Sequence, residues 1–261
     1  DYSSSITLAI DHWLAEQPPS GLLPYGFDFL TDRESEPNKV SMANLARQTY
    51  AAAVLSDYYA RTGDTRARPA LEQFLVAFGE RSLPFGKGRL QTLVEATHVL
   101  SMPIGRYKIQ SALKRLGLMY DTAGTGKVPS PDGHYGHAYT GGVALALLTE
   151  LRYSQASGDA RFADLRRAWL DGLLALRIPG RGFRELPTAI DSAPYSDGQA
   201  WLALAEYHRR FPQDRRVAAV LADVDDSLIA LYGHEYRPMF YHWGTMAAAA
   251  RYADTHDPRF L

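Results

Sequence analysis

The segment from Val143 to Phe162 reads VALALLTELRYSQASGDARF. Alanine and leucine occupy every side of its first part, which is typical of a helix that lies inside a protein. Gly158 suits the end of that helix because glycine is unfavourable in a helix interior. Asp159 suits the start of the next helix because its carboxylate accepts unpaired backbone N–H groups. The segment therefore predicts a buried helix, a tight turn and a second helix.

The same pattern recurs elsewhere in the chain. In each copy an alanine-rich stretch runs into a tyrosine, and an aspartate and an arginine follow, in segments 58–66, 153–161, 207–216 and 252–259. The closing aspartates lie 95, 55 and 43 positions apart. Because the first gap is about twice the later ones, we expect one further, degenerate unit near residues 89–121. A period of about 45–55 residues corresponds to one helix hairpin with its loops.

Two kinds of helix alternate in these units. The first kind is apolar nearly all round, at 51–55, 143–148, 200–205 and 246–250. The second kind carries one apolar stripe, at 67–81, 160–176 and 215–231. A helix that is apolar on all sides belongs inside and a striped helix outside. We therefore expect an all-α fold, with an (α/α) toroid favoured over an open superhelix of the tetratricopeptide type.

We expect residues 1–261 to form a single domain. A first helix around Ile6–Glu16 has no inner helix of its own. The sequence also stops at Arg259–Leu261, where the earlier units begin an outer helix. The expectation is therefore an incomplete ring or a fragment of a longer chain, which allows for a larger assembly.

The composition excludes several classes of function. The 28 basic and 29 acidic residues give a net charge of -1, without the basic surplus that nucleic-acid binding requires. The absence of cysteine removes disulfides, zinc–thiolate sites and cysteine nucleophiles. No apolar run reaches the roughly 20 residues that span a bilayer. The polar start reads as a mature N-terminus, and we favour a periplasmic or secreted protein, although the compartment is left open.

The loops that lead into the inner helices are rich in aromatic and ionisable residues. They are segments 23–33, 132–139, 185–199 and 234–244, at equivalent positions of the units. Aromatic faces stack on the C–H faces of sugars, and a few polar groups hold the hydroxyls. We therefore expect these loops to meet at one face and to bind an oligosaccharide or polysaccharide. The predicted substrate-binding residues are Tyr25, Asp28, Arg47, His137, Tyr139, Tyr195, Gln199, Trp201, Tyr241, His242 and Trp243.

Two stretches carry a resemblance to known proteins. Phe27-Asp28-Phe29 precedes Asn44-Leu45-Ala46-Arg47-Gln48 and the alanine-rich helix of the first unit, and the second stretch is Tyr195–Leu204. Both resemble α/α-toroid carbohydrate-active proteins: six-hairpin glycosidases, N-acylglucosamine 2-epimerase-like proteins and glucuronyl C5-epimerase-like proteins. The resemblance implies a glutamate where Gln199 stands, so this chain departs from the pattern there.

Three chemistries fit these residues. Glycoside hydrolysis, the leading prediction, needs two carboxylates, and we expect Asp197 to act with Glu185 or Asp132. A uronate lyase or epimerase needs a base near the sugar C5, from His134, Tyr135, His137 or Tyr139, with Arg47 or Arg237 on the sugar carboxylate. A zinc site would use His134, His137 and His242 or Asp132, but no HExxH or CxxC motif occurs.

We therefore expect neither a metal nor a cofactor. The rival class is a non-catalytic helical repeat module that binds a glycan or a protein partner. The glutamine at position 199 favours that alternative. An assay of glycan binding beside an assay of turnover separates the two classes.

Overall fold

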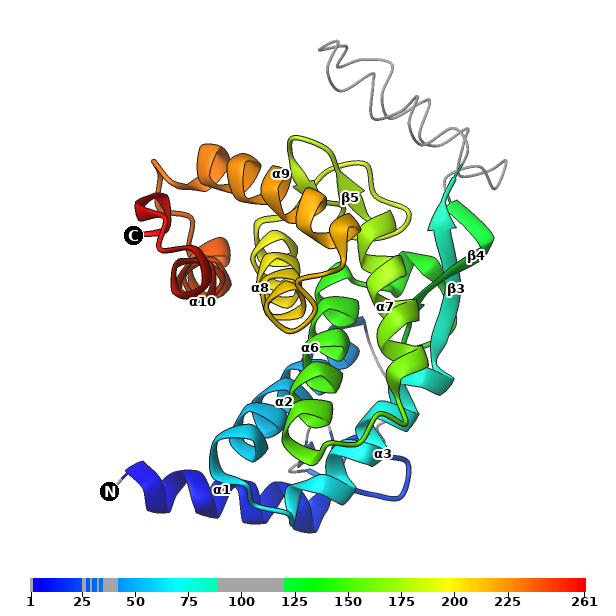
Figure 1. The fold of residues 1–261 in the computed structure, drawn as a ribbon. Helices are drawn as coiled ribbons and strands as arrows, with labels where there is room; N and C mark the ends of the chain where they lie inside the picture. The colour runs from blue at the N-terminus through cyan, green and yellow to red at the C-terminus, as the bar shows by residue number, and fades with distance from the viewer. Residues whose placement is uncertain (1, 25–26, 29, 32, 35–41, 89–119) are drawn as a thin grey trace.

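The structure is a computed structural model that describes residues 2–24, 27–28, 30–31, 33–34, 42–88 and 120–261. This part of the chain is mostly helical, which confirms the all-α prediction (Figure 1). Its helices are α1 (Tyr2–Glu16), α2 (Met42–Thr62), α3 (Ala67–Glu80), α6 (Thr140–Ser157), α7 (Ala163–Ala175), α8 (Pro194–Arg210), α9 (Arg215–Tyr232) and α10 (Pro238–Thr255). Two 3₁₀ turns are η1 (Tyr135–His137) and η2 (Pro258–Phe260).

The strands form short antiparallel hairpins. They are β1 (Phe27–Asp28) with β2 (Arg33–Glu34), β3 (Ser82–Lys87) with β4 (Tyr120–Pro129), and β5 (Arg177–Ile178) with β6 (Gly182–Phe183). None of the three hairpins pairs with another, so they decorate the helices and do not form a layer of their own.

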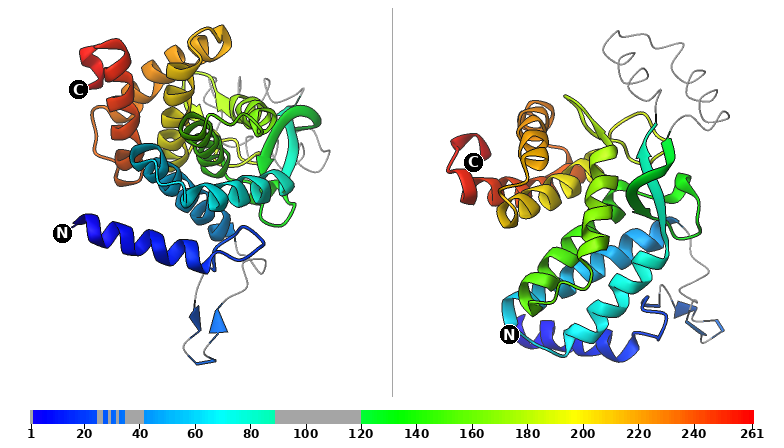
Figure 2. Two further views of the ribbon diagram at one scale, coloured as in Figure 1. Left: turned by 60° about the horizontal axis from the view of Figure 1, so that its bottom comes forward. Right: turned by 45° about the vertical axis from the view of Figure 1, so that its right-hand side comes forward.

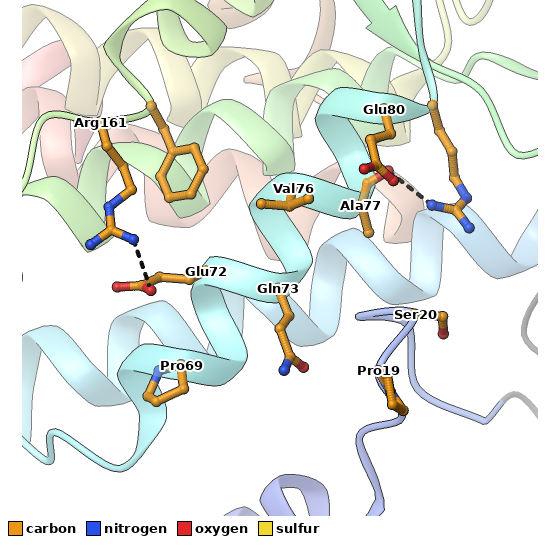
Figure 3. Close-up of a pocket in the computed structure, with 11 residues that line it drawn as sticks. Pro19, Ser20, Pro69, Glu72, Gln73, Val76, Ala77, Glu80 and Arg161 are labelled. Carbon is orange, nitrogen blue, oxygen red and sulfur yellow. Dashed lines mark hydrogen bonds and ion pairs between the residues drawn. The ribbon is translucent and has the colours of Figure 1, made fainter.

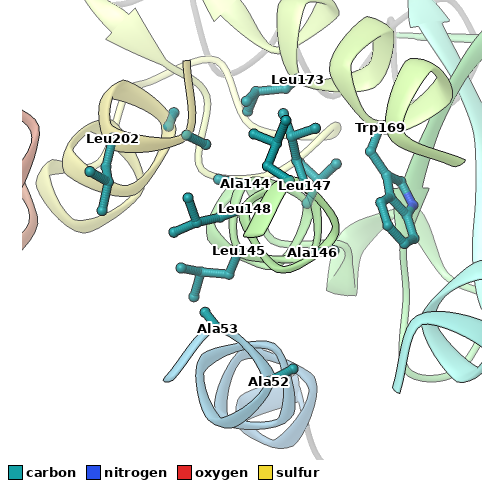
Figure 4. Close-up of a cluster of buried hydrophobic side chains, with 14 of the residues drawn as sticks. Ala52, Ala53, Ala144, Leu145, Ala146, Leu147, Leu148, Trp169, Leu173 and Leu202 are labelled. Carbon is teal, nitrogen blue, oxygen red and sulfur yellow. The ribbon is translucent and has the colours of Figure 1, made fainter. Parts of the chain in front are cut away.

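The inner helices pack on one another in chain order. α2 contacts α6, α6 contacts α8, and α8 contacts α10, while α3, α7 and α9 follow their inner partners as predicted (Figures 1 and 2). Residues 143–148 of α6 are buried on every side, among α2, α7 and α8 (Figure 4). The corresponding stretch of α10 is not enclosed in this way, because Met246 and Ala249 are exposed. α10 packs on α8 and also meets α2, where Trp243 contacts Tyr50.

The sequence predicts one degenerate hairpin near residues 89–121. Residues 89–119 lie outside the described part, but residues 120–121 begin strand β4, and α2 packs directly on α6. β4 also lies on α7, with Gly126 against Gly172. A Cβ at Gly126 would come within 2.5 Å of the Gly172 backbone nitrogen, so this strand–helix contact requires glycine.

The repeated aspartate and arginine fasten each turn to the preceding unit. The aspartate side chain accepts the arginine backbone N–H two positions later, and α9 begins with such a cap at Asp214. The arginine guanidinium then reaches the preceding outer helix, in the pairs Arg66–Asp11, Arg161–Glu72, Arg216–Asp171 and Arg259–Asp226. Since α1 accepts Arg66 as α3, α7 and α9 accept theirs, α1 stands in the position of an outer helix.

The inner helices run parallel, with their N-terminal ends together. Near the starts of α8 and α10, Gly198 lies against Trp243, and at the start of α6, Gly141 lies against Gln199 of α8. Near the other ends, Arg152 of α6 binds both carboxylate oxygens of Glu206 on α8. The loops leading into α6, α8 and α10 are therefore neighbours. Among the described helices, none is long and apolar enough to cross a membrane.

Candidate functional site

The loop before α6 holds an imidazole against a carboxylate. Nδ1 of His137 lies 2.6 Å from Oδ2 of Asp132, and both side chains are partly exposed. Asp132 Oδ1 accepts the backbone N–H of His134, and Gly133 between them takes the left-handed φ of 79° that the tight loop requires. This Asp132–His137 dyad is the oriented pair that acid–base chemistry needs.

Hydrogen bonding keeps Asp132 in its charged form. Partial burial raises the pKa of this carboxyl, but hydrogen bonds from His137 and from the His134 backbone outweigh burial, so the pKa is lowered overall. A carboxylate at Nδ1 selects the tautomer that carries its proton there. Nε2 of His137 then has the lone pair that accepts a proton from a substrate.

Two further predicted residues, Tyr139 and Glu185, lie in the loops before α6 and α8. The Thr140 backbone N–H donates to the Glu185 carbonyl, so the loop before α8 is tied to the start of α6. Burial, and after it the charge of Glu185, raises the pKa of the Tyr139 hydroxyl, which therefore stays protonated at neutral pH. The Asp132–His137 dyad and Tyr139 thus lie in the same loop, at the N-terminal end of α6.

An aromatic cluster lies at the leading end of α10. The Trp243 ring is buried, and edge-to-face contacts join it to Tyr50 of α2 at 5.5 Å and to Tyr195 of α8 at 6.3 Å between ring centroids. His242 contacts Trp243 in the same way at 5.0 Å. The sequence patterns do not identify Tyr50, because this residue lies within α2 and not in a loop that precedes an inner helix. The available signal was an aromatic residue directly before the alanine-rich stretch of α2.

Gln199 connects the two groups. Its side chain lies against Gly141, two residues after Tyr139, and a Cβ at Gly141 would collide with the Gln199 amide oxygen. Gly198, its neighbour, lies against Trp243. The dyad and the aromatic cluster are therefore linked through contiguous contacts across α6, α8 and α10.

Asp197 lies on the other side of α8, in the core. It is 0% exposed, and its carboxylate accepts the Phe183 backbone N–H at 2.6 Å and the Tyr232 hydroxyl at 2.7 Å. Gly182, at φ 120°, leaves the space that the carboxylate fills. Burial raises the pKa of Asp197 to about 7 despite these hydrogen bonds. Asp197 joins α8 to β6 and α9. It does not line the face on which the N-terminal ends of the inner helices lie.

Asp197→Asn is expected to remove a pH dependence of stability. The folded-state pKa of about 7 exceeds the unfolded value, so the folded protein keeps a proton that the unfolded chain loses between about pH 4 and pH 7. The wild-type free energy of unfolding should therefore fall as pH rises through that window. Urea unfolding of the two proteins at about pH 5 and pH 8 should show a larger fall in wild type than in the variant. A variant with the same pH slope would contradict it.

Trp201 also lies in the core. Its Nε1–H donates to Asp225 at 2.7 Å, and its ring stacks on Phe240. Asp225 in turn binds Arg251 of α10 through both carboxylate oxygens. These contacts give Trp201 a role in joining α8, α9 and α10 and leave it outside the leading face.

The other predicted residues lie apart from the two groups. Tyr135 packs on Tyr120 and Phe85 and donates to the Pro84 carbonyl, which attaches η1 to the β3–β4 hairpin. Tyr241 is exposed against Tyr236. Arg47 is exposed on α2. Tyr25 and the side chain of Asp28 lie outside the described residues.

His134 lies beside the dyad, with its ring 5.9 Å from that of His137. His242 belongs to the aromatic cluster on α10. Within the described ranges, no three His, Asp or Glu side chains are grouped as a metal site would require.

Two further cavities are present, and the second of them is lined in part by the predicted residues Trp201, Arg237 and Tyr241. One of about 520 Å³ lies on the outer helix α3, where Arg161 pairs with Glu72 across it (Figure 3). Another, of about 480 Å³, runs along α9 and α10 and is lined largely by apolar side chains such as Ile229 and Phe260. Neither contains the dyad. No protein-family model, no curated protein and no solved structure matches this chain.

Proposed function

We propose that the protein is a carbohydrate-active enzyme that removes a ring proton from a uronate residue of an oligosaccharide or polysaccharide. The observation that carries the proposal is the 2.6 Å contact between His137 and Asp132 at the leading end of α6. Uronate lyases and epimerases share this first step, in which a base takes the proton beside the sugar carboxylate.

Nε2 of His137 is the proposed base, with Asp132 holding the ring and stabilising the imidazolium that forms. In elimination, the C5–H bond breaks, a C4–C5 double bond forms, and the C4–O bond breaks. Tyr139 is the proposed donor of a proton to the departing oxygen. In epimerisation, a proton returns to C5 from the opposite face.

The burial of Asp197 disfavours glycoside hydrolysis. Two carboxylates must face the scissile bond in that reaction, whereas both oxygens of Asp197 are hydrogen-bonded inside the protein. Asp132 is engaged by His137, which leaves Glu185 as the unshared carboxylate of the predicted set on the leading face.

We also propose that the repeated hairpins belong to an (α/α) toroid. Parallel inner helices with their leading ends together support that architecture. So does the contact of Tyr50 with Trp243, because it brings the first and the last inner helix of the described chain together.

A second candidate is a non-catalytic module that binds a glycan. The aromatic cluster of Tyr50, Tyr195 and Trp243 favours it, because those rings present a sugar-binding surface that contains no member of the dyad. In that case His137 and Asp132 serve only to shape the loop.

The test is incubation with alginate, pectate and heparosan in deuterated water. Epimerisation predicts deuterium at the uronate C5. Elimination leaves no hydrogen on C5 and predicts an ultraviolet-absorbing unsaturated uronate instead. Release of reducing ends with neither signal would establish hydrolysis instead. Binding without deuterium incorporation or cleavage would establish the module.

A further inference from the structure

A pocket of about 150 Å³ lies between α2 and α10, and no member of the dyad lines it. Tyr50 and Asp57 contribute from α2, His242 and Trp243 from α10, and Arg152 from α6. The pocket is small beside the two cavities of about 520 and 480 Å³.

The charged groups of this pocket are already paired. Arg152 binds both carboxylate oxygens of Glu206, donates to the Ala53 carbonyl, and lies 3.8 Å from Asp57. Asp57 also accepts the Arg61 guanidinium at 2.7 Å. Since each guanidinium has a carboxylate partner, the pocket has no surplus cation for a uronate or phosphate. An uncharged ligand fits this balance.

The walls of the pocket are suited to a sugar ring. Tyr50 and, beside the pocket, Tyr195 are 42% and 43% exposed, and the buried Trp243 ring holds both by edge-to-face contacts. Aromatic faces fixed in this way receive the C–H face of a sugar. His242 and the Tyr50 hydroxyl supply hydrogen-bonding groups for its hydroxyls.

We propose that this pocket binds one neutral sugar ring of the substrate, so that the glycan combines a uronate at the dyad with an uncharged sugar between α2 and α10. The inference rests on the proposed function, since the uronate is assigned there. Gly141 lies against Gln199, and Gly198 lies against Trp243, so the starts of α6, α8 and α10 that carry the two positions are neighbours. The substrate class is therefore a heteroglycan that contains both uronic acid and neutral sugar.

The test is saturation-transfer NMR with methyl glycosides of glucose, galactose and mannose, beside methyl glucuronide. At least one neutral glycoside should bind, and methyl glucuronide should not compete with it. Tyr50→Ala should weaken neutral binding about fivefold to tenfold through loss of the stacking face. Tyr236→Ala is the matched control, because it removes an exposed aromatic ring near α10 that does not line the pocket.

Each outcome separates this inference from the proposed function. Deuterium incorporation by the wild type without binding of any neutral glycoside would overturn the pocket assignment alone. Neutral binding that is unchanged in Tyr50→Ala, or stronger binding of methyl glucuronide at this pocket, would also overturn it. Neutral binding that Tyr50→Ala weakens, with neither deuterium incorporation nor an unsaturated product, would support the pocket and remove the catalytic proposal.

Discussion

Replacement of His137 by alanine is expected to lower turnover of the responsive uronate polysaccharide by about 10²- to 10⁴-fold, the contribution of a positioned acid–base group. The loss should appear in kcat, because the imidazole acts on the proton in transit and not on the bound sugar. Initial rates of deuterium incorporation at C5 measure it for epimerisation, and initial rates of ultraviolet absorbance measure it for elimination. Near-ultraviolet circular dichroism should be unchanged, since the side chain is partly exposed.

His134→Ala is the matched control for this prediction. It removes a neighbouring imidazole whose ring lies 5.9 Å from that of His137 but that makes no side-chain hydrogen bond to Asp132. Asp132→Asn should reduce turnover less than His137→Ala and shift the pH profile, because an amide no longer stabilises the imidazolium. Equal turnover in wild type and His137→Ala would remove the dyad from the mechanism.

Replacement of Asp225 by alanine is expected to cost about 3–5 kcal/mol of unfolding free energy, because it leaves the Arg251 guanidinium buried without its carboxylate. The same change removes the acceptor of the Trp201 indole N–H. The Asp225–Arg251 ion pair joins α9 to α10. If α10 detaches first in the variant, the urea unfolding transition should also broaden. Urea unfolding followed by tryptophan emission measures both effects.

Asp226→Ala provides the comparison at the next position. Its partner Arg259 and its own carboxylate are both more than half exposed, so the loss should be about 0–1 kcal/mol. Similar losses in the two variants would show that the burial of the Asp225 pair contributes nothing. Because Arg251 is the charge left behind, the double change Asp225→Ala with Arg251→Met should recover part of the loss.

The helices were predictable from the sequence because local signals define them. Alanine-rich stretches, a left-handed glycine at Gly63 and Gly158, and the aspartate after each turn all act within a few residues. The apolar stripe of α9, with Val217, Leu221 and Leu228 buried, follows from periodicity alone.

The β3–β4 hairpin was not predictable in this way. Its strands are far apart in the sequence, and Gly126 is required by the distant Gly172 of α7, which no local pattern reveals. The further helical unit that the aspartate spacing predicts near residues 89–121 falls almost wholly outside the described residues.

The site residues that lie in loops were predictable, whereas the direction of those inside helices was not. Loop position identified Asp132, His137 and Trp243, but helix phase decides what a residue inside a helix faces. Asp197 and Gln199 are two positions apart, so they point to different sides of α8. Asp197 consequently faces the core and Gln199 faces α6, although both belong to one motif in the sequence.

The pairing of β3 with β4 brings the chain back to the place from which it departs. Lys87 stands opposite Tyr120, so whatever lies between them is closed at its base by backbone hydrogen bonds. Doubling the length of such a closed loop costs only about 0.6 kcal/mol of chain entropy. Insertions or deletions beyond this hairpin would therefore cost little stability. The packing of α2 on α6 would stay the same.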